Sequence, residues 1–243
     1  MKLTTLITTS CVAFGLLLAA GQAQAKKARK HEFGIGAMGL VNGSFIGEPS
    51  EEEKAYENAQ LPYPGFAGVG GGGGLSFAYM YRGAIGLELD LLYMAERGTG
   101  TYDFGALDVD VTLSQSSIHI PLMVKAAIPY RTTRPFLMVG PEFVIPVSSE
   151  VDAGSITDLK SASADFYTAL GFGLGMDIIL PVSDADIRIP IAFRGNWTPG
   201  FSRKVTDRYP TVDLEGNTAR IREISTEWEF QAFFTIGVAY HFK

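Results

Sequence analysis

Hydrophobic and polar side chains alternate along several segments of this chain. The alternation is clearest in residues 228–242, WEFQAFFTIGVAYHF, where a large apolar side chain stands at almost every second position. Residues 85–95, IGLELDLLYMA, and residues 187–197, IRIPIAFRGNW, show the same period of two. Because successive side chains of a β-strand point to opposite faces, this period predicts strands that each carry one apolar face.

Weaker alternation predicts five more strands. Two begin near Glu32 and Phe66, and the others span residues 116–128, 135–147 and 165–180. Each of the roughly eight strands is near or above the ~9–11 residues that a tilted strand needs to cross a membrane. Pro121 and Pro190 lie inside two of these strands, although proline cannot donate a hydrogen bond to a neighbouring strand.

The connections between the predicted strands alternate in length. Short connections lie at Tyr81–Gly83, 129–134 and 181–185, and long polar connections lie at 47–65, 98–110, 148–164 and 199–225. Barrels of bacterial outer membranes have tight turns on the periplasmic side and longer loops outside. We therefore predict an all-β fold, a closed up-and-down antiparallel transmembrane β-barrel of about eight strands with both termini at one end.

The first 25 residues have the pattern of a secretory signal peptide. Lys2 precedes an apolar segment from about Cys11 to Ala20, and residues 23–25 form an A-x-A cleavage pattern. Residues 26–243 then form one barrel domain. Because Cys11 is the only cysteine, the predicted mature chain has no thiol for a disulfide, for catalysis or for a metal ion.

The charge balance narrows the choice of partners. The whole chain has a formal charge of −6, and the predicted mature chain is one unit more negative because it lacks Lys2. Phosphate binding requires a cationic surface, so a nucleic-acid partner is not expected.

Aromatic residues fall at the two ends of the predicted strands. Tyr130, Phe136, Tyr240 and Phe242 fall at the inner ends, and Tyr93, Phe166, Trp197 and Trp228 fall at the outer ends. Two aromatic belts are expected for a barrel in a bilayer. A period of two does not separate such a barrel from a soluble one with an apolar interior, but the signal peptide, the loop lengths and these belts favour the membrane.

Three segments resemble a known family. They are SIHIPLMVK (Ser117–Lys125), PFLMVGPEF (Pro135–Phe143) and the terminal GVAYHF (Gly237–Phe242). They are similar to strands of the porin-family outer-membrane β-barrel domain of Gram-negative bacteria, typified by small eight-stranded barrels. The resemblance implies residence in the outer membrane, contact with lipid and lipopolysaccharide, and insertion by the barrel-assembly machinery through Tyr240 and Phe242. Lys243 departs from the family's usual aromatic end.

Charged residues lie on the face opposite the apolar one. Within a barrel they would point into the lumen, which for eight strands is just wide enough for side chains to fill. Buried charges must be paired or hydrogen-bonded, so these residues predict a polar plug of salt bridges. The proposed members are Glu88, Asp90, Glu142, Asp177 and Glu229 with Lys125, Arg188 and Arg194. A catalytic carboxylate pair and a narrow ion path are the alternatives.

Five consecutive glycines occupy residues 70–74, within GVGGGGGLSF. Gly68 to Gly73 match G-x-G-x-x-G, but a strand-like segment follows where a nucleotide-binding motif needs a helix. We predict a glycine-lined strand. Inward glycines would leave room for larger lumen side chains, and outward glycines would ease curvature.

No chemistry-bearing motif emerges from the remaining residues. His31, His119 and His241 fall on separate strands without metal-ligand spacing, and no His-x-Ser pair occurs. We predict no cofactor, no metal and no enzymatic activity. The predicted function is that of an integral outer-membrane barrel with a filled polar lumen, structural, adhesive or ligand-contacting through four long extracellular loops. A narrow porin-like channel for small solutes and a soluble periplasmic lipid-binding barrel remain as alternatives.

Overall fold

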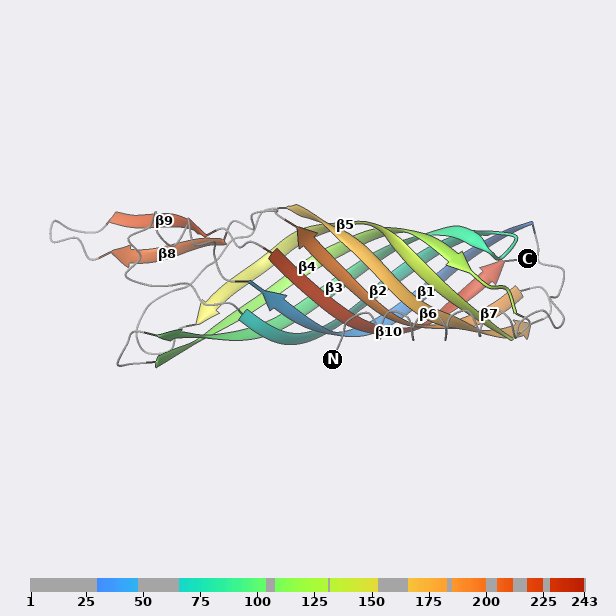
Figure 1. Cartoon of the computed structure of the whole chain (residues 1–243), viewed down its shortest axis with the longest axis horizontal. Helices are drawn as coiled ribbons and strands as arrows, with labels where there is room; N and C mark the ends of the chain where they lie inside the picture. Colours follow the sequence, from blue (N-terminus) through green and yellow to red (C-terminus); the bar gives the residue numbers. More distant parts are fainter. Residues whose placement is uncertain are drawn as a thin grey trace, which may run out of the picture.

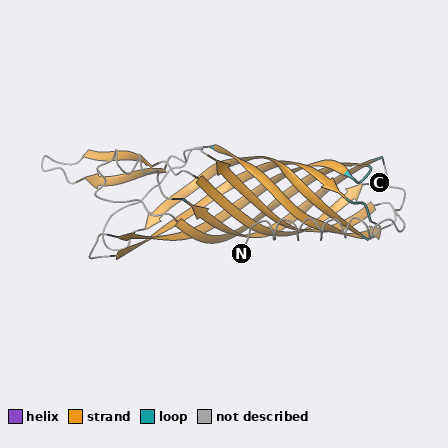
Figure 2. Cartoon of the chain, in the orientation of Figure 1, coloured by secondary structure: helices purple, strands orange, loops and turns teal. Residues whose placement is uncertain are grey.

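The computed structural model describes residues 30–47, 66–103, 108–130, 132–152, 166–182, 185–199, 205–211, 218–224 and 228–242. The predicted signal peptide lies outside these residues. The regular elements in them are β-strands (Figures 1 and 2). Their bounds are β1 (His31–Ile46), β2 (Phe66–Tyr81), β3 (Ile85–Asp103), β4 (Asp108–Ala127), β5 (Thr133–Asp152), β6 (Tyr167–Val182), β7 (Ala185–Pro199), β8 (Val205–Thr211), β9 (Thr218–Ile224) and β10 (Trp228–Phe242). No helix in the described residues is long and apolar enough to cross a membrane.

Eight of the strands close into a barrel in the order β1-β10-β7-β6-β5-β4-β3-β2. Each neighbouring pair is antiparallel, and β10 closes the barrel on β1. The predicted fold class, a closed up-and-down antiparallel barrel of eight strands, is confirmed. The strands β8 and β9 pair with each other in a separate two-stranded sheet, which Figure 1 shows beyond the barrel end opposite the C-terminus.

Two of the long polar connections are shorter than predicted. Strand β3 continues to Asp103 and β4 begins at Asp108, so most of the connection expected at 98–110 is a hairpin. Strand β5 likewise continues to Asp152. Outside the membrane both faces of a hairpin contact water, so these extensions need no apolar face and their polar composition was mistaken for a loop. The hairpin of β8 and β9 lies inside the expected loop 199–225, where the charged composition of the sequence was taken for a loop.

The register sets the tilt of the strands. A path that starts at Glu32 of β1 and steps at each strand to the directly opposite residue of the next strand returns to β1 at Asn42. Asn42 is ten residues further along β1 than Glu32. The intermediate partners are Met80, Gly86, Lys125, Met138, Gly173, Arg194 and Phe233. Strand number and stagger together fix the width of a barrel, and eight strands leave an interior that side chains can fill.

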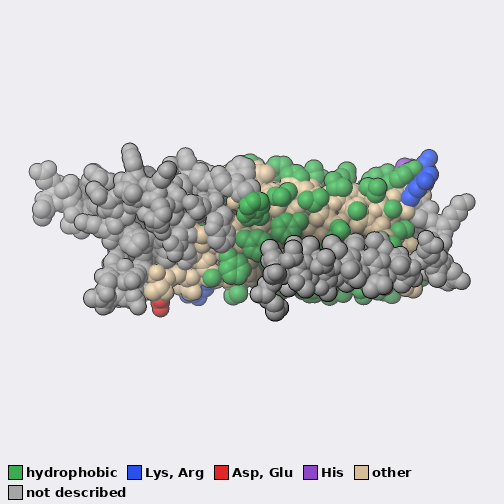
Figure 3. Space-filling model, viewed as in Figure 1, with side chains coloured by type: hydrophobic (Ala, Val, Ile, Leu, Met, Phe, Trp, Pro, Cys, Tyr) green, Lys and Arg blue, Asp and Glu red, His purple; other side chains and the backbone are tan. Residues whose placement is uncertain are grey.

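The apolar face of the strands points outwards. Leu87 and Phe234 are 49% and 44% exposed on the outer wall, whereas Asp90 and Arg194 are 0% and 2% exposed in the lumen. Figure 3 shows hydrophobic side chains along the middle of the barrel, with charged side chains towards its ends. A soluble lipid-binding barrel would have the reverse orientation, so the periplasmic alternative is wrong.

Aromatic side chains border this apolar wall. At the end with the short turns, Tyr240 and Phe242 are exposed with ring centroids 5.1 Å apart. At the other end Tyr93, Phe166 and Trp197 are exposed, and the side chain of Trp228 lies outside the described residues. Phe136 was wrongly assigned to the inner belt, because the alternation of β5 turns it into the lumen, where it is 4% exposed.

The short turns also shape the interior. Arg82 and Gly83 have φ angles of 52° and 65°, as the central residues of a type I′ turn do, and the Ala84 amide donates to the Tyr81 carbonyl oxygen at 3.1 Å. The connection predicted at 129–134 is shorter, because β5 begins at Thr133. Arg134 therefore lies inside the strand, and its side chain is buried in the lumen.

Candidate functional site: the lumen of the barrel

The glycine run forms part of the lumen wall, in strand β2. Ser76 and Met80 of this strand point inwards, so the period of two places Gly70, Gly72 and Gly74 on the same inner face. A Cβ atom added at Gly72 or Gly74 would overlap a backbone carbonyl oxygen of β3. The glycine-lined strand is confirmed, and its odd-numbered members Gly71 and Gly73 point to the outer wall.

A cluster of apolar side chains fills the space beside these glycines. We call it the apolar lumen cluster; it consists of Met38, Leu40, Leu92, Met94 and Phe233. Gly74 pairs with Met38 and Leu92, and Gly72 pairs with Leu40 and Met94. Each inward glycine thus stands between two large inward side chains, which use the volume that it leaves. The prediction of a polar lumen is corrected in this respect, since apolar side chains interrupt it here and in a second buried cluster formed by Met123, Phe136, Met138 and Ala192.

Five charged side chains meet in the middle of the lumen, and we call them the central ion-pair group. Arg194 donates from Nη1 to Asp90 and from Nη2 to Glu88, both at 2.5 Å. Lys125 Nζ donates to Glu88 at 2.9 Å and to Asp177 at 3.4 Å. Lys125 Nζ also lies 3.7 Å from the centre of the Phe136 ring. These five of the eight predicted members lie inside the barrel, and ion pairs link them into one group.

A second ion-pair group, the periplasmic ion-pair group, lies nearer the short turns. Glu32 accepts hydrogen bonds from Arg134 Nη1, at 2.9 Å, and from Arg188 Nη2. Arg188 therefore pairs with Glu32 and not with the carboxylates that the sequence analysis proposed. Glu32 and Arg134 were not predicted as lumen residues, because Glu32 lies at the start of a predicted strand and Arg134 lies in the predicted connection 129–134. Continuing the alternation of β1 back from Met38 would have pointed Glu32 inwards.

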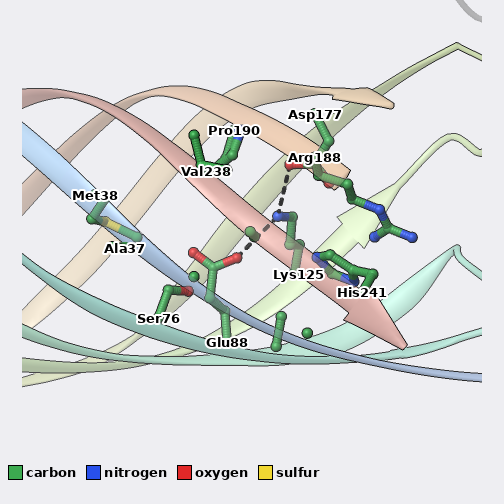
Figure 4. Close-up of a pocket in the computed structure, with 14 residues that line it drawn as sticks. Ala37, Met38, Ser76, Glu88, Lys125, Asp177, Arg188, Pro190, Val238 and His241 are labelled. Atoms are coloured by element: carbon green, nitrogen blue, oxygen red, sulfur yellow. Dashed lines mark hydrogen bonds and ion pairs between the residues drawn. The ribbon is translucent and has the colours of Figure 1, made fainter. Parts of the chain in front are cut away.

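A cavity of about 20 Å³ is lined by members of both groups (Figure 4). Glu88, Lys125, Asp177, Arg188 and His241 line its polar side, with small residues such as Gly34 and Ser76. A space of this size holds about one water molecule. Arg188 Nε and Nη1 and His241 Nδ1 have no hydrogen-bond partner in the protein, so a water molecule here would satisfy buried polar atoms.

The half of the lumen nearer the long connections contains a different arrangement, which we call the outer network. His119 Nδ1 lies 2.6 Å from Glu142 Oε1, and Ser117 Oγ lies 2.8 Å from His119 Nε2. Asn196 Nδ2 donates to Glu142 at 2.8 Å and to Gln231 at 3.0 Å. Glu142 was expected to meet lysine or arginine, and this is corrected: its partners are an imidazole and an amide.

The outer network continues across the lumen through amide side chains. Gln231 Nε2 donates to Glu96 and to Glu229, each at 3.2 Å. Asn42 Nδ2 donates to Glu96 at 3.0 Å, and Gln115 donates to the same carboxylate. Glu229 is thus inside the barrel as placed by sequence, but its contact here is with Gln231. Neutral amides were passed over in the sequence because they carry no charge.

The order Ser117–His119–Glu142 is the hydrogen-bond order of a catalytic triad. Ser117 and His119 are two residues apart on β4, so the ordinary alternation of the strand turns both inwards, and the register shift opposite them places the extra residue on β5. The pair has the order Ser-x-His, the reverse of the His-x-Ser order considered in the sequence. Ser117 is 6% exposed and His119 0% exposed, and neither residue lines the lumen cavity, so a substrate has no described space beside the hydroxyl. Within the described residues no three His, Cys, Asp or Glu side chains form a metal site.

A closed eight-stranded barrel with an apolar wall, aromatic ends and a lumen of paired charges defines the class of outer-membrane β-barrel proteins. The sequence model of the outer membrane protein beta-barrel domain family matches residues 12–242. The chain therefore belongs to this family, and it lies in the outer membrane. A comparison with curated protein sequences gives no significant match.

Solved structures give the same fold. The outer membrane protein OprG from Pseudomonas aeruginosa is 14% identical, with a TM-score of 0.51 over 90% of this chain and 99% of that chain. The outer membrane protease OmpT from Escherichia coli is 8% identical, with a TM-score of 0.48 over 91% and 99% of the two chains. Outer membrane protein W from E. coli is 18% identical, with a TM-score of 0.33 over 85% and 98%. At 14% identity the likeness to OprG shows a common fold, and the two lower scores carry no argument.

Proposed function

We propose that this protein is a non-conducting membrane anchor that holds its long connections at the cell surface, where they serve envelope integrity, adhesion or ligand contact. The observation that carries the proposal is the filled lumen. The central ion-pair group, the apolar lumen cluster and the outer network consist of buried side chains that pack inside the barrel, and the cavity beside the ion-pair groups holds about one water molecule. An ion would have to displace paired charges to pass.

Single-channel recording in planar bilayers tests this proposal. The purified protein is expected to give no steady conductance steps, because hydrated ions have no continuous path. The double variant Met38→Ala/Phe233→Ala is the positive control. It removes two large side chains of the apolar lumen cluster and should therefore give conductance steps. Steady ion-sized steps from the unaltered protein would favour the narrow porin-like channel instead.

The surface role concerns the end of the barrel beyond the membrane. Strands β3, β4 and β5 extend there, and the β8–β9 hairpin gives an additional two-stranded sheet. Replacing residues 200–227 by a short Gly/Ser linker is expected to leave barrel folding intact, measured by heat-modifiable migration. Cells that rely on the truncated protein should lose detergent resistance or surface adhesion relative to cells with the full chain. Full retention of both phenotypes would contradict a role for this connection.

Insertion by the barrel-assembly machinery through Tyr240 and Phe242 stays a prediction, as does contact with lipopolysaccharide. Both side chains are exposed at the end of the final barrel strand, where another protein can reach them. Phe242→Ala should lower the outer-membrane fraction of the protein. Phe33→Ala, at an equally exposed aromatic on β1, is the control and should leave that fraction unchanged.

A further inference from the structure

A groove in the outer wall of the barrel runs from the short-turn ends of β4 and β5 to the middle of β6 and β7. It has a volume of about 460 Å³. Its apolar side chains are Val124, Leu137, Val139, Phe172, Leu174 and Phe193, each 40–60% exposed. Met138, Gly173 and Arg194 are directly opposite partners on β5, β6 and β7, and their backbone forms the floor of the groove. The side chains of Met138 and Arg194 point into the lumen.

The register explains why the wall is hollow here. Val124, Val139 and Phe172 form one row of outward side chains, and Leu137, Leu174 and Phe193 form the next row. The ring of Phe172 leans over Gly195 and stacks with Phe230, with ring centroids 6.3 Å apart. A Cβ atom at Gly195 would lie 2.9 Å from that ring. Phe172 therefore leans towards β7 and β10 and leaves the space over β5 and β6 open.

The environment of the groove identifies its occupant. The wall faces membrane hydrocarbon, so an acyl chain is the chemistry available to fill it. Ala126, at the shallow end of the groove, is one residue from the end of β4 at the short-turn side of the barrel, which is periplasmic in this class. Phospholipid and not lipopolysaccharide is the lipid of the periplasmic leaflet. In hydrocarbon there is no hydrophobic driving force, so retention depends on close van der Waals contact on several sides of the chain.

We propose that this groove is a specific lipid site that holds one acyl chain of a periplasmic-leaflet phospholipid. Two flanking rows of side chains contact the chain from either side, and the backbone of the floor contacts it from below. A convex part of the wall offers contact from one side alone. The site does not depend on whether the lumen conducts, so its test is separate from bilayer recording.

Native mass spectrometry of protein extracted from outer membranes in mild detergent tests the site. The unaltered protein is expected to carry one phospholipid. Val139→Phe fills the middle of the groove and should lower the lipid-bound fraction about tenfold or more. Val238→Phe makes the same change at an exposed valine of β10 away from the groove, and should leave that fraction unchanged.

Each other outcome overturns the proposal. These outcomes are an unaltered protein without bound phospholipid, equal retention by Val139→Phe, equal loss in both variants, a lipopolysaccharide mass in place of a phospholipid, and a second copy of the chain. Heat-modifiable migration verifies that both variants are folded. Anomalous diffraction from a lipid with a brominated acyl chain then locates the ligand, with the bromine peak expected between Val139 and Phe172.

Discussion

The two halves of the lumen stabilise their buried carboxylates with different partners. In the periplasmic half, Arg194 and Lys125 neutralise the carboxylates of Glu88, Asp90 and Asp177 in direct ion pairs. In the outer half, the carboxylate of Glu142 contacts His119 and Asn196, which are an imidazole and an amide. Both halves are buried, so water screens neither.

This difference predicts which half of the lumen loses more stability when one of its side chains is replaced. Removing one partner of a buried ion pair leaves an uncompensated charge, which costs about 3–5 kcal/mol. Removing a hydrogen bond to a carboxylate whose partners are an imidazole and an amide costs about 1.5–3 kcal/mol. We therefore expect the periplasmic half to tolerate substitution less well than the outer half, although both halves are equally enclosed.

The largest effect is expected for Arg194→Met. The substitution leaves Glu88 and Asp90 without their shared guanidinium, and should lower the free energy of unfolding in phospholipid vesicles by about 3–5 kcal/mol. Adding Glu88→Gln and Asp90→Asn to this variant removes the stranded charges and should recover part of the loss. A loss below about 1 kcal/mol, the value of an ordinary hydrogen bond, would show that the pairs are not structural.

Matched substitutions compare the halves directly. Glu88→Gln takes a negative charge from between Arg194 and Lys125, and should cost about 3 kcal/mol or more of unfolding free energy. Glu142→Gln retains an acceptor for Asn196 and should cost about 1.5–3 kcal/mol, because the hydrogen bonds that it weakens are made to a carboxylate. Urea titration of both proteins in the same vesicles measures the difference. Equal losses would refute the distinction between the two halves.

A third prediction concerns the glycine wall. Gly72→Ala places a Cβ against the carbonyl oxygen of Tyr93, and should cost about 1–3 kcal/mol of unfolding free energy by overpacking. Gly39→Ala is the control, because its Cβ would lie 3.9 Å from the carbonyl oxygen of Gly72. If the two variants are equally stable, close packing does not explain the glycines.

The smallest effect is expected for Ser117→Ala. It removes one hydrogen bond to His119 and should cost about 0.5–1.5 kcal/mol of unfolding free energy. A fluorophosphonate probe, which labels activated serines, should not react with Ser117 in the folded protein because the hydroxyl is enclosed. Labelling that disappears in Ser117→Ala and persists in Ser116→Ala would instead identify a reactive serine.

Much of the architecture could be predicted because period-two alternation is a local property. The inward and outward faces of β3 and β10 are those expected from the alternation of Glu88 with Leu87 and of Gln231 with Phe230. Phe136 shows the limit of a local rule: its position near a strand end suggested the membrane interface, but its parity turns it inwards. The β8–β9 hairpin was not predicted because its sequence is rich in charged residues.

The pairing of lumen residues could not be predicted in the same way. Arg188 and Glu32 are 156 residues apart in sequence, and His119 and Glu142, on neighbouring strands, are 23 residues apart. Glu88 and Arg194 meet although they are 106 residues apart. Such contacts depend on how far each strand is shifted against the next.

The order of residues was therefore enough to determine strands, their two faces and the apolar wall that places this barrel in a membrane, since each follows from neighbours along one strand. Which buried charges meet, where an apolar cluster separates them, and where a groove opens in the wall were decided by the closed barrel. The physical reason is the stagger of ten residues around eight strands, which brings side chains from distant segments to the same level of the lumen.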